Sequence, residues 1–252
     1  MAAALRAILW DVDGTLAETE FEGHRLAFNA AFAEHGLPWR WDRETYLPLL
    51  RIGGGRERMA AWLRDAEGAP VSEALLDGLV ASKASHYAAL LRRGLPLREG
   101  VERLISAAAA AGLSQLIVTT SSRAAVSALL SSSLAGQASA FSACICGDDV
   151  RRKKPDPEGY RLALARLALE PHQVLAVEDS PPGLLAATGA GLPTLITLSE
   201  VSRHEPLETF APAAAVLDGL GNEQRTTRVL RGPACPEGLA TLSWLECLLP
   251  TP

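Results

Sequence analysis

Four carboxylates lie within ten residues near the N-terminus, in the segment LWDVDGTLAETE at residues 9–20. They belong to Asp11, Asp13, Glu18 and Glu20. Like charges this close repel one another, so a cation or a substrate group is expected to compensate them. Asp11 and Asp13 follow the apolar run Ala7–Trp10. Because residues two apart in an extended chain point the same way, these two acids are expected to address one site.

Other polar side chains follow later apolar runs. A cluster of hydroxyls, Thr120, Ser121 and Ser122, comes after one run, and Glu178 and Asp179 come after another. In open parallel sheets, ligands bind just beyond the carboxyl ends of the strands. Hard carboxylate oxygens that leave room for water and phosphate suit Mg²⁺. The sequence therefore predicts a Mg²⁺ site at one edge of a sheet.

The elements that position these residues are short apolar runs separated by helical patterns. Runs of this length are typical of strands buried on both faces of a parallel sheet. The predicted strands are Ala7–Trp10, Leu116–Thr119, Ala143–Cys146, Val174–Val177 and Thr194–Thr197. The predicted helices between them are 101–111, 123–130, 158–169 and 183–190. Strand–helix alternation of this kind predicts an α/β fold with right-handed crossovers.

One segment, from about His24 to Arg93, contains no strand-like run. It has four helical stretches instead, at 25–34, 42–50, 56–64 and 73–91. We expect a helical insert at 19–96, with 1–18 and 97–252 forming the sheet domain. A further helix is expected near the C-terminus, at 237–249.

Composition narrows the class of protein. The 252 residues carry a net charge of −5 and are 48% apolar, which fits one domain with an insert. The sequence has no basic stripe of the kind that would indicate nucleic acid or an anionic membrane surface as a partner. Asp11 ends the first apolar run too early for a secretory core or a membrane span. The cysteines, Cys144, Cys146, Cys235 and Cys247, are expected to be free thiols in a reducing compartment.

Four motifs in order resemble those of the haloacid dehalogenase-like (HAD) hydrolases. They are DVDGTL at 11–16, the hydroxyl of Thr120, Lys154 in KKPDP, and Glu178-Asp179-Ser180. The resemblance extends from about Ile8 to Val216. It implies a HAD-like Rossmannoid parallel sheet core with an inserted α-helical cap.

The resemblance also implies roles for these residues. Asp11 is the nucleophile that forms an aspartyl-phosphate, and Asp13 is the acid and base. Mg²⁺ would be held by Asp11, the Asp13 main-chain oxygen and Asp179, with Glu178 nearby. The phosphoryl oxygens would be bound by Thr120, Ser121, Ser122 and Lys154. Phosphoryl transfer needs charge neutralisation and in-line placement above all, which this set provides.

The cap contains a glycine-rich loop, IGGGRERM, at 52–59. Gly53, Gly54 and Gly55 before a helix expose main-chain N–H groups, and Arg56 adds charge, so a second phosphate is expected there. This loop, the ETE run at 18–20, the Gly-His-Arg step at His24 and the RKKPDP motif are similar to the CbbY family, particularly its photosynthetic, plant-type members. Contacts to substrate are accordingly expected from Glu18, Glu20 and His24.

Family membership implies a phosphatase that converts xylulose 1,5-bisphosphate, a Rubisco inhibitor, to xylulose 5-phosphate. The implied enzyme is a monomer with a small sugar bisphosphate as its partner. It would act in the bacterial or cyanobacterial cytoplasm, or in the plastid stroma if a transit peptide has been removed. A phosphomutase of the β-phosphoglucomutase type and a non-catalytic HAD-fold regulator remain as alternatives.

Several of these residues also have a structural interpretation. The hydroxyls at 119–122 are typical helix caps. The glycines at 53–55 could form only a flexible connector between helices. Glu18 and Glu20 could be ordinary linker residues, and His24 could have a purely structural role on its helix.

Overall fold

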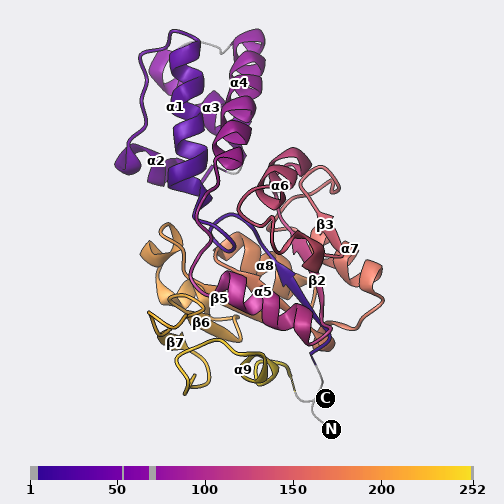
Figure 1. The fold of residues 1–252 in the computed structure, drawn as a ribbon. Helices are drawn as coiled ribbons and strands as arrows, with labels where there is room; N and C mark the ends of the chain where they lie inside the picture. The colour runs from indigo at the N-terminus through magenta and orange to yellow at the C-terminus, as the bar shows by residue number, and fades with distance from the viewer. Residues whose placement is uncertain (1–4, 53, 68–71, 251–252) are drawn as a thin grey trace. The chain divides into compact units, whose positions relative to one another are not determined.

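The computed structural model describes residues 5–52, 54–67 and 72–250. Its contacts divide the chain into two compact units. The larger unit consists of Met1–Glu18 with Pro96–Pro252, and the smaller one is Thr19–Leu95. Figure 1 shows the larger unit as a sheet with helices and the smaller one as helices. Each unit is described by itself.

The larger unit is built on a seven-stranded sheet in the order β3-β2-β1-β4-β5-β6-β7. The strands are β1 Ala7–Trp10, β2 Ser114–Val118, β3 Ala143–Ile145, β4 Val174–Glu178, β5 Thr194–Thr197, β6 Ala215–Leu217 and β7 Val229–Arg231. All neighbours are parallel except β6 and β7. The α/β fold with a parallel sheet, predicted from the apolar runs, is therefore confirmed.

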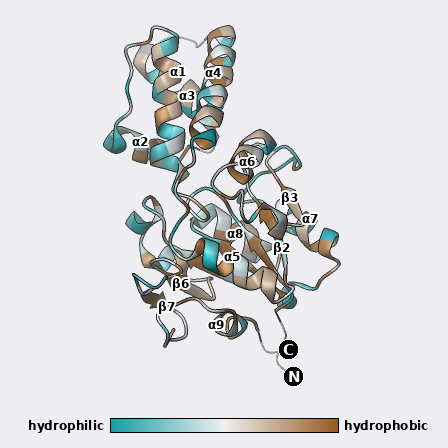
Figure 2. Cartoon of the chain, in the orientation of Figure 1, coloured by the Kyte–Doolittle hydropathy of each residue, from teal (hydrophilic) through white to brown (hydrophobic). Residues whose placement is uncertain are grey.

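Apolar burial explains why these runs form the centre of the sheet. Every residue of β1 and β4 is buried, and strands in the middle of the larger unit are drawn mostly in brown in Figure 2. Trp10 lies opposite Ile117 on one side and Val177 on the other. This register brings the ends of β1, β2 and β4 to the same edge of the sheet.

Helices cover the sheet where the sequence pattern places them. They are α5 Val101–Ala110, α6 Arg123–Leu130, α7 Glu158–Leu167 and α8 Pro181–Gly189. Short 3₁₀ turns lie at η2 Ala138–Ala140, η3 Pro171–Gln173, η4 Ser202–His204 and η5 Leu207–Phe210. In α5 the buried residues are Val101, Leu104, Ile105 and Ala108. This spacing of three and four residues forms one apolar face.

Two features near the C-terminus differ from the sequence prediction. The strands β6 and β7 were not predicted, because β6 ends an alanine-rich stretch and no residue of β7 is buried, so neither gives a clear strand pattern. The predicted helix at 237–249 is wrong in length, since α9 spans only Leu242–Glu246. Gly238 adopts a positive φ of 64°, and Thr241 caps the helix by accepting a hydrogen bond from the Trp244 N–H at 3.3 Å. The turn at Gly238 therefore delays the start of the helix.

The smaller unit is helical, with the four stretches predicted for the insert. They are α1 Arg25–Glu34, α2 Arg43–Leu49, α3 Gly55–Glu67 and α4 Glu73–Arg92. A π-helical turn, η1 Glu20–His24, leads into α1 and was not predicted. An aromatic cluster forms the core, with Trp41 4.9 Å from Phe28, 4.8 Å from Phe32 and 5.8 Å from Tyr46 between ring centroids. Aromatic packing of this kind stabilises the unit beyond its buried area.

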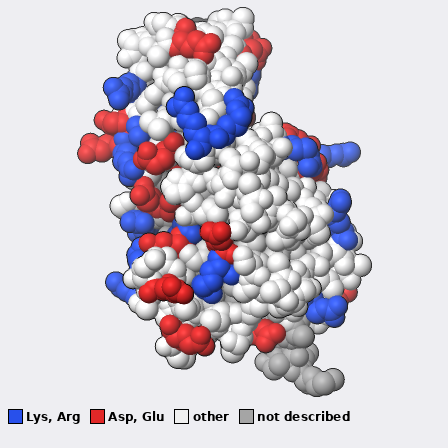
Figure 3. Space-filling model, in the orientation of Figure 1, with Lys and Arg blue, Asp and Glu red and all other residues white. Residues whose placement is uncertain are grey.

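Acidic and basic side chains are mixed on the face of the described residues that Figure 3 shows. Among the described helices, none combines the length and apolarity needed to cross a bilayer.

Candidate active site

Three acids meet at the carboxyl ends of β1 and β4. Asp11 follows β1, Glu178 is the last residue of β4, and Asp179 follows it. Because β1 and β4 are neighbours in the sheet, one carboxylate oxygen from each acid lies within 4.8 Å of the others. All three side chains are buried. The structure thus brings together three of the four predicted metal ligands through their side chains.

Lys154 lies between two of these acids. Its Nζ donates to Asp11 Oδ1 at 2.6 Å and to Glu178 Oε1 at 2.5 Å. A third hydrogen bond goes to the Val118 carbonyl at 2.8 Å. All three ammonium protons therefore have acceptors, which fixes the position of the charge.

The electrostatics of the cluster leave negative charge uncompensated. Burial raises the pKa of Asp11 to about 7, and Glu178 adds to the shift while Lys154 opposes it. Burial and the two neighbouring acids also raise the pKa of Asp179 well above its usual value. For Lys154, burial lowers the pKa, but the two acids outweigh it and raise the pKa overall. One ammonium for three buried acids favours a further cation.

The donor set fits Mg²⁺. Asp11, Glu178 and Asp179 offer only carboxylate oxygens, which are the hard ligands that Mg²⁺ prefers. Two or three carboxylates also leave coordination positions for water and phosphate. The identity of the ion remains a proposal.

Asp13 and Ser121 form a second polar pair next to the cluster. The Ser121 hydroxyl donates to Asp13 Oδ2, and the Ser121 N–H donates to Thr119 Oγ1 at 3.1 Å. The side chain of Asp13 is thereby held toward the loop after β2. This arrangement leaves the Asp13 carboxylate outside the three-acid cluster, where it is suited to proton transfer.

The remaining hydroxyls of the β2 loop differ in their surroundings. Thr120 is exposed and lines a small pocket together with Lys154 and Tyr160. Ser122 instead caps α6, accepting a hydrogen bond from the Ala125 N–H at 3.3 Å. Thr120 is therefore available to a phosphoryl group, whereas the Ser122 hydroxyl already has a structural role.

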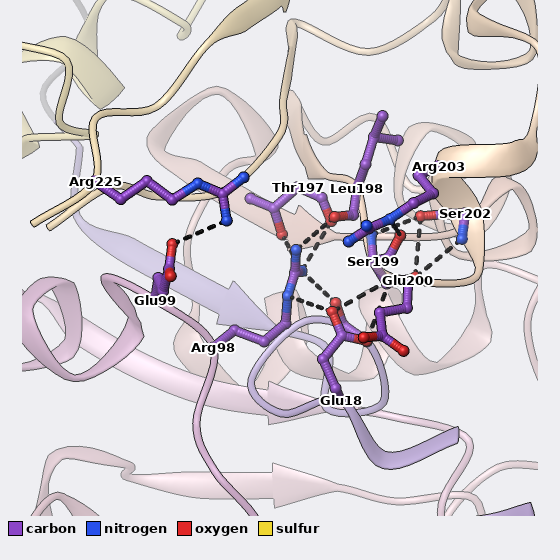
Figure 4. Close-up of polar contacts among 11 residues, drawn as sticks. Glu18, Arg98, Glu99, Thr197, Leu198, Ser199, Glu200, Ser202, Arg203 and Arg225 are labelled. Atoms are coloured by element: carbon purple, nitrogen blue, oxygen red, sulfur yellow. Dashed lines mark hydrogen bonds and ion pairs between the residues drawn. The ribbon is translucent and has the colours of Figure 1, made fainter. Parts of the chain in front are cut away.

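Glu18 is directed away from the other acids of its segment. Its Oε1 lies 3.1 Å from Arg98 Nε, and its carboxylate accepts a hydrogen bond from the Glu200 N–H at 3.3 Å. Figure 4 shows the carboxylate of Glu18 among these partners. The structure does not bring Glu18 together with the three acids, and a substrate contact from it stays a prediction.

Two predicted cap residues have partners within the smaller unit. Glu20 Oε2 accepts from the Tyr46 hydroxyl at 2.7 Å. His24 Nδ1 lies 2.7 Å from Lys83 Nζ, and its ring stacks on Tyr87 with 3.9 Å between centroids. Both side chains are held by neighbours in the cap, as a structural role requires.

The glycine-rich loop is described in part. Gly53 lies outside the described residues, Gly54 has a φ of 96°, and Gly55 begins α3. Arg56 donates to Asp77 at 2.5 Å and to Glu73 at 2.6 Å, both on α4. Its guanidinium is therefore engaged by two exposed carboxylates in this structure.

Sequence reasoning missed several residues around the acids. Tyr160 is fully buried and donates to Glu178 Oε1 at 2.6 Å. Ser199 lies beside Gly14 and the Asp179 carboxylate, and Arg98 binds the loop that contains Asp13. Tyr160 lies on the apolar face of a helix and Arg98 in a linker, so neither stands out in the sequence. Their contacts join segments far apart in the chain.

Comparison with known proteins identifies the class. A family model described as haloacid dehalogenase-like hydrolase matches residues 5–191. The chain therefore belongs to the haloacid dehalogenase-like hydrolases. Its relatives in that family include the plasmid-encoded protein CbbY of Cupriavidus necator, which is 43% identical over 225 residues, covering 86% of this chain and 87% of the relative.

A solved structure agrees with this assignment. A mutant form of CbbY from Rhodobacter sphaeroides, in complex with xylulose-(1,5)bisphosphate, has a TM-score of 0.78 and 42% identity. The match covers 87% of this chain and 98% of that one. A phosphoglycolate phosphatase of Yersinia pseudotuberculosis is 32% identical, covering 83% of this chain and 88% of the relative. The resemblance to HAD hydrolases and CbbY is thus confirmed, as is the predicted enzyme class, a phosphatase of this family.

Proposed function

We propose that the protein is a Mg²⁺-dependent phosphatase that removes one phosphate from a small sugar bisphosphate through an aspartyl-phosphate on Asp11. The most suitable substrate is xylulose 1,5-bisphosphate, with xylulose 5-phosphate as the product. The observation that carries this proposal is the convergence of Asp11, Glu178 and Asp179, with the Lys154 ammonium paired to Asp11 and Glu178. The CbbY structure with xylulose-(1,5)bisphosphate supports the choice of substrate.

In this proposal Asp11 acts as the nucleophile. Its carboxylate attacks phosphorus, and the bond between phosphorus and the sugar oxygen breaks. Lys154, at 2.6 Å from Asp11 Oδ1, favours the ionised carboxylate that this attack needs. Mg²⁺, when bound by Asp11 and Asp179 with Glu178 beside them, supplies positive charge for the phosphoryl oxygens.

Asp13 is placed to transfer the proton. It gives a proton to the leaving sugar oxygen and later takes one from the water that hydrolyses the aspartyl-phosphate. The hydrogen bond from Ser121 orients the Asp13 carboxylate for both steps. Thr120, which is exposed, and Lys154, beside Asp11, are suited to bind the transferred phosphoryl group.

The proposal is tested by measuring phosphate release from a panel of sugar mono- and bisphosphates, with and without Mg²⁺. We expect release that requires Mg²⁺ and a kcat/KM highest for xylulose 1,5-bisphosphate. Release from every sugar phosphate at the same kcat/KM would contradict the substrate assignment. Interconversion of sugar phosphates with little free phosphate would indicate the mutase, and binding without turnover would indicate a regulator.

A further inference from the structure

A single guanidinium joins two separate segments of the larger unit. Arg98 Nη1 donates to the Gly14 carbonyl and to the carbonyl and hydroxyl of Thr197, at 2.9 and 2.8 Å for the last two. Its Nη2 donates to the Leu198 carbonyl at 2.6 Å, and its Nε lies 3.1 Å from Glu18 Oε1. All three nitrogens are engaged by protein acceptors, as Figure 4 shows for the partners it labels. The side chain is only 9% exposed.

The two segments that Arg98 binds most directly contact the metal-ligand candidate Asp179. A Cβ built on Gly14 would overlap the Asp179 carboxylate and would lie 3.0 Å from the Ser199 Cβ. Ser199, which follows Leu198 directly, therefore lies in the same small space as the Asp179 carboxylate. The Gly14 main chain and the Ser199 side chain therefore both border the Asp179 carboxylate.

Arg98 is also connected through its main chain to the segment that follows Gly14. The Arg98 N–H donates to the Leu16 carbonyl at 2.9 Å, and Ala17 pairs with Leu97 in an antiparallel bridge. The Gly14 segment therefore has a backbone connection to Arg98 as well as the hydrogen bond from its side chain.

We propose that Arg98 is a positioning residue, which holds the Gly14 and Ser199 segments against Asp179 and so sets the geometry in which the acids bind Mg²⁺. This inference rests on the proposed function. Arg98 does this through its planar fork, whose directions match acceptors on both segments, 14–18 and 197–198, at once. A lysine keeps the charge but has no fork, so it cannot hold both segments in the same geometry.

A second, partly buried arginine provides a control. Arg103, on α5, donates to the carbonyls of Leu220 at 3.0 Å, Gly221 at 3.3 Å and Ala240 at 3.0 Å. Like Arg98, it donates hydrogen bonds to main-chain carbonyls, but none of these acceptors contacts Asp11, Glu178 or Asp179. If Arg98 only stabilised the fold, replacing either arginine by lysine would affect the protein in the same way.

The experiment compares Arg98→Lys with Arg103→Lys by calorimetric titration with Mg²⁺ alone, by kcat and KM for the sugar phosphate, and by Tm. Groups that orient metal ligands typically change metal affinity or activity by about 10-fold to 100-fold when mutated. We expect Arg98→Lys to raise the Kd for Mg²⁺ and to lower kcat by about 10-fold or more, with KM changed by less than about threefold. Arg103→Lys is expected to lower Tm and to leave the Kd for Mg²⁺ and kcat unchanged. Equal effects of the two variants on Mg²⁺ binding would overturn the proposal.

A milder variant covers the case in which Arg98→Lys does not fold. Thr197→Val removes one acceptor of Arg98, the hydroxyl at 2.8 Å, and keeps the remaining hydrogen bonds. We expect a smaller increase in the Kd for Mg²⁺ in the same direction, and an unchanged Kd would overturn the proposal. The calorimetric comparison does not depend on turnover. Failure of the wild-type protein to release phosphate would therefore reject the proposed function, whereas similar Mg²⁺ binding by wild type and variants would reject the role of Arg98.

Discussion

The ammonium of Lys154 lies 2.6 Å from Asp11 Oδ1, although 143 residues separate the two in the chain. The contact places a fixed positive charge beside the proposed nucleophile and within 2.5 Å of Glu178. It offsets part of the repulsion among the three acids and leaves the rest to a cation or a phosphoryl group.

Replacement of Lys154 by methionine should impair both activity and stability. Removing one member of a buried ion pair leaves an uncompensated charge and costs about 3–5 kcal/mol in the free energy of unfolding. We expect urea denaturation of the metal-free protein to detect this loss and phosphate release to fall by about 100-fold or more. Arg151→Met, at an exposed position nearby, serves as the control. A Lys154→Met protein as stable and active as the control would contradict the role of the ion pair.

Asp11→Asn tests the nucleophile. An amide of the same shape keeps the packing but lacks the nucleophilic oxygen, so we expect phosphate release to fall by about 10³-fold or more. The free energy of unfolding without metal should be unchanged or higher, because the variant removes one of three repelling acids. Phosphate release at the wild-type rate would remove Asp11 from the mechanism.

Stabilisation by Mg²⁺ should depend on pH. Burial raises the pKa of Asp11 from 3.8 to about 7, and the pKa of Asp179 rises in the same direction. Between pH 3.8 and about 7, the native metal-free protein then binds more protons than the unfolded chain. Its stability therefore falls as pH rises through this window to about 7. Mg²⁺ needs ionised ligands and competes with these protons.

We therefore expect the increase in Tm caused by a fixed Mg²⁺ concentration to be larger at pH 8 than at pH 6. The apparent affinity should fall about tenfold per pH unit below the pKa of Asp11 when one proton is displaced. Differential scanning fluorimetry at several pH values measures this. A pH-independent shift in Tm would argue against Asp11 and Asp179 as ligands.

Tyr160→Phe should affect the site more than the fold. The variant removes the hydrogen bond from the Tyr160 hydroxyl to Glu178 Oε1 at 2.6 Å and leaves the ring in place. We expect a loss of about 1 kcal/mol in the free energy of unfolding and a decrease in kcat of about tenfold, because Glu178 loses a donor that orients it. Thr194→Val removes a buried hydroxyl that donates to the Leu192 carbonyl at 3.1 Å and should lower stability alone. Equal kcat in both variants would show that the Tyr160 hydroxyl is structural.

Arg56→Ala tests the second phosphate site in the cap. If Arg56 binds the phosphate that is not transferred, its loss should raise KM for bisphosphates by about 10-fold, since a charged hydrogen bond is lost, and leave KM for monophosphates nearly unchanged. Asp77→Asn should lower KM for bisphosphates, because it removes one carboxylate that engages the Arg56 guanidinium. Arg64→Ala, an exposed position in the last turn of α3, is the control. Equal effects on both substrate classes would place the second phosphate elsewhere.

The hydropathy pattern and the polar residues at the strand ends allow much of the sheet and of the candidate site to be predicted from the sequence. Runs such as Ala7–Trp10 and Val174–Val177 bury every residue, so they indicate strands directly. The parallel arrangement then places Asp11 and Asp179 at one edge of the sheet, since ligands gather at the carboxyl ends of such strands. The strands β6 and β7 were not predicted, since β6 ends an alanine-rich stretch and β7 buries none of its residues.

Only the tertiary structure decided which partners the polar groups take. Glu18 resembles the other acids of its segment in sequence, yet it pairs with Arg98, 80 residues further along the chain. Ser122 caps a helix while its neighbour Ser121 binds Asp13. The physical reason is that hydropathy repeats over a few residues, whereas hydrogen bonds and ion pairs join whichever groups the folded chain brings within about 3 Å.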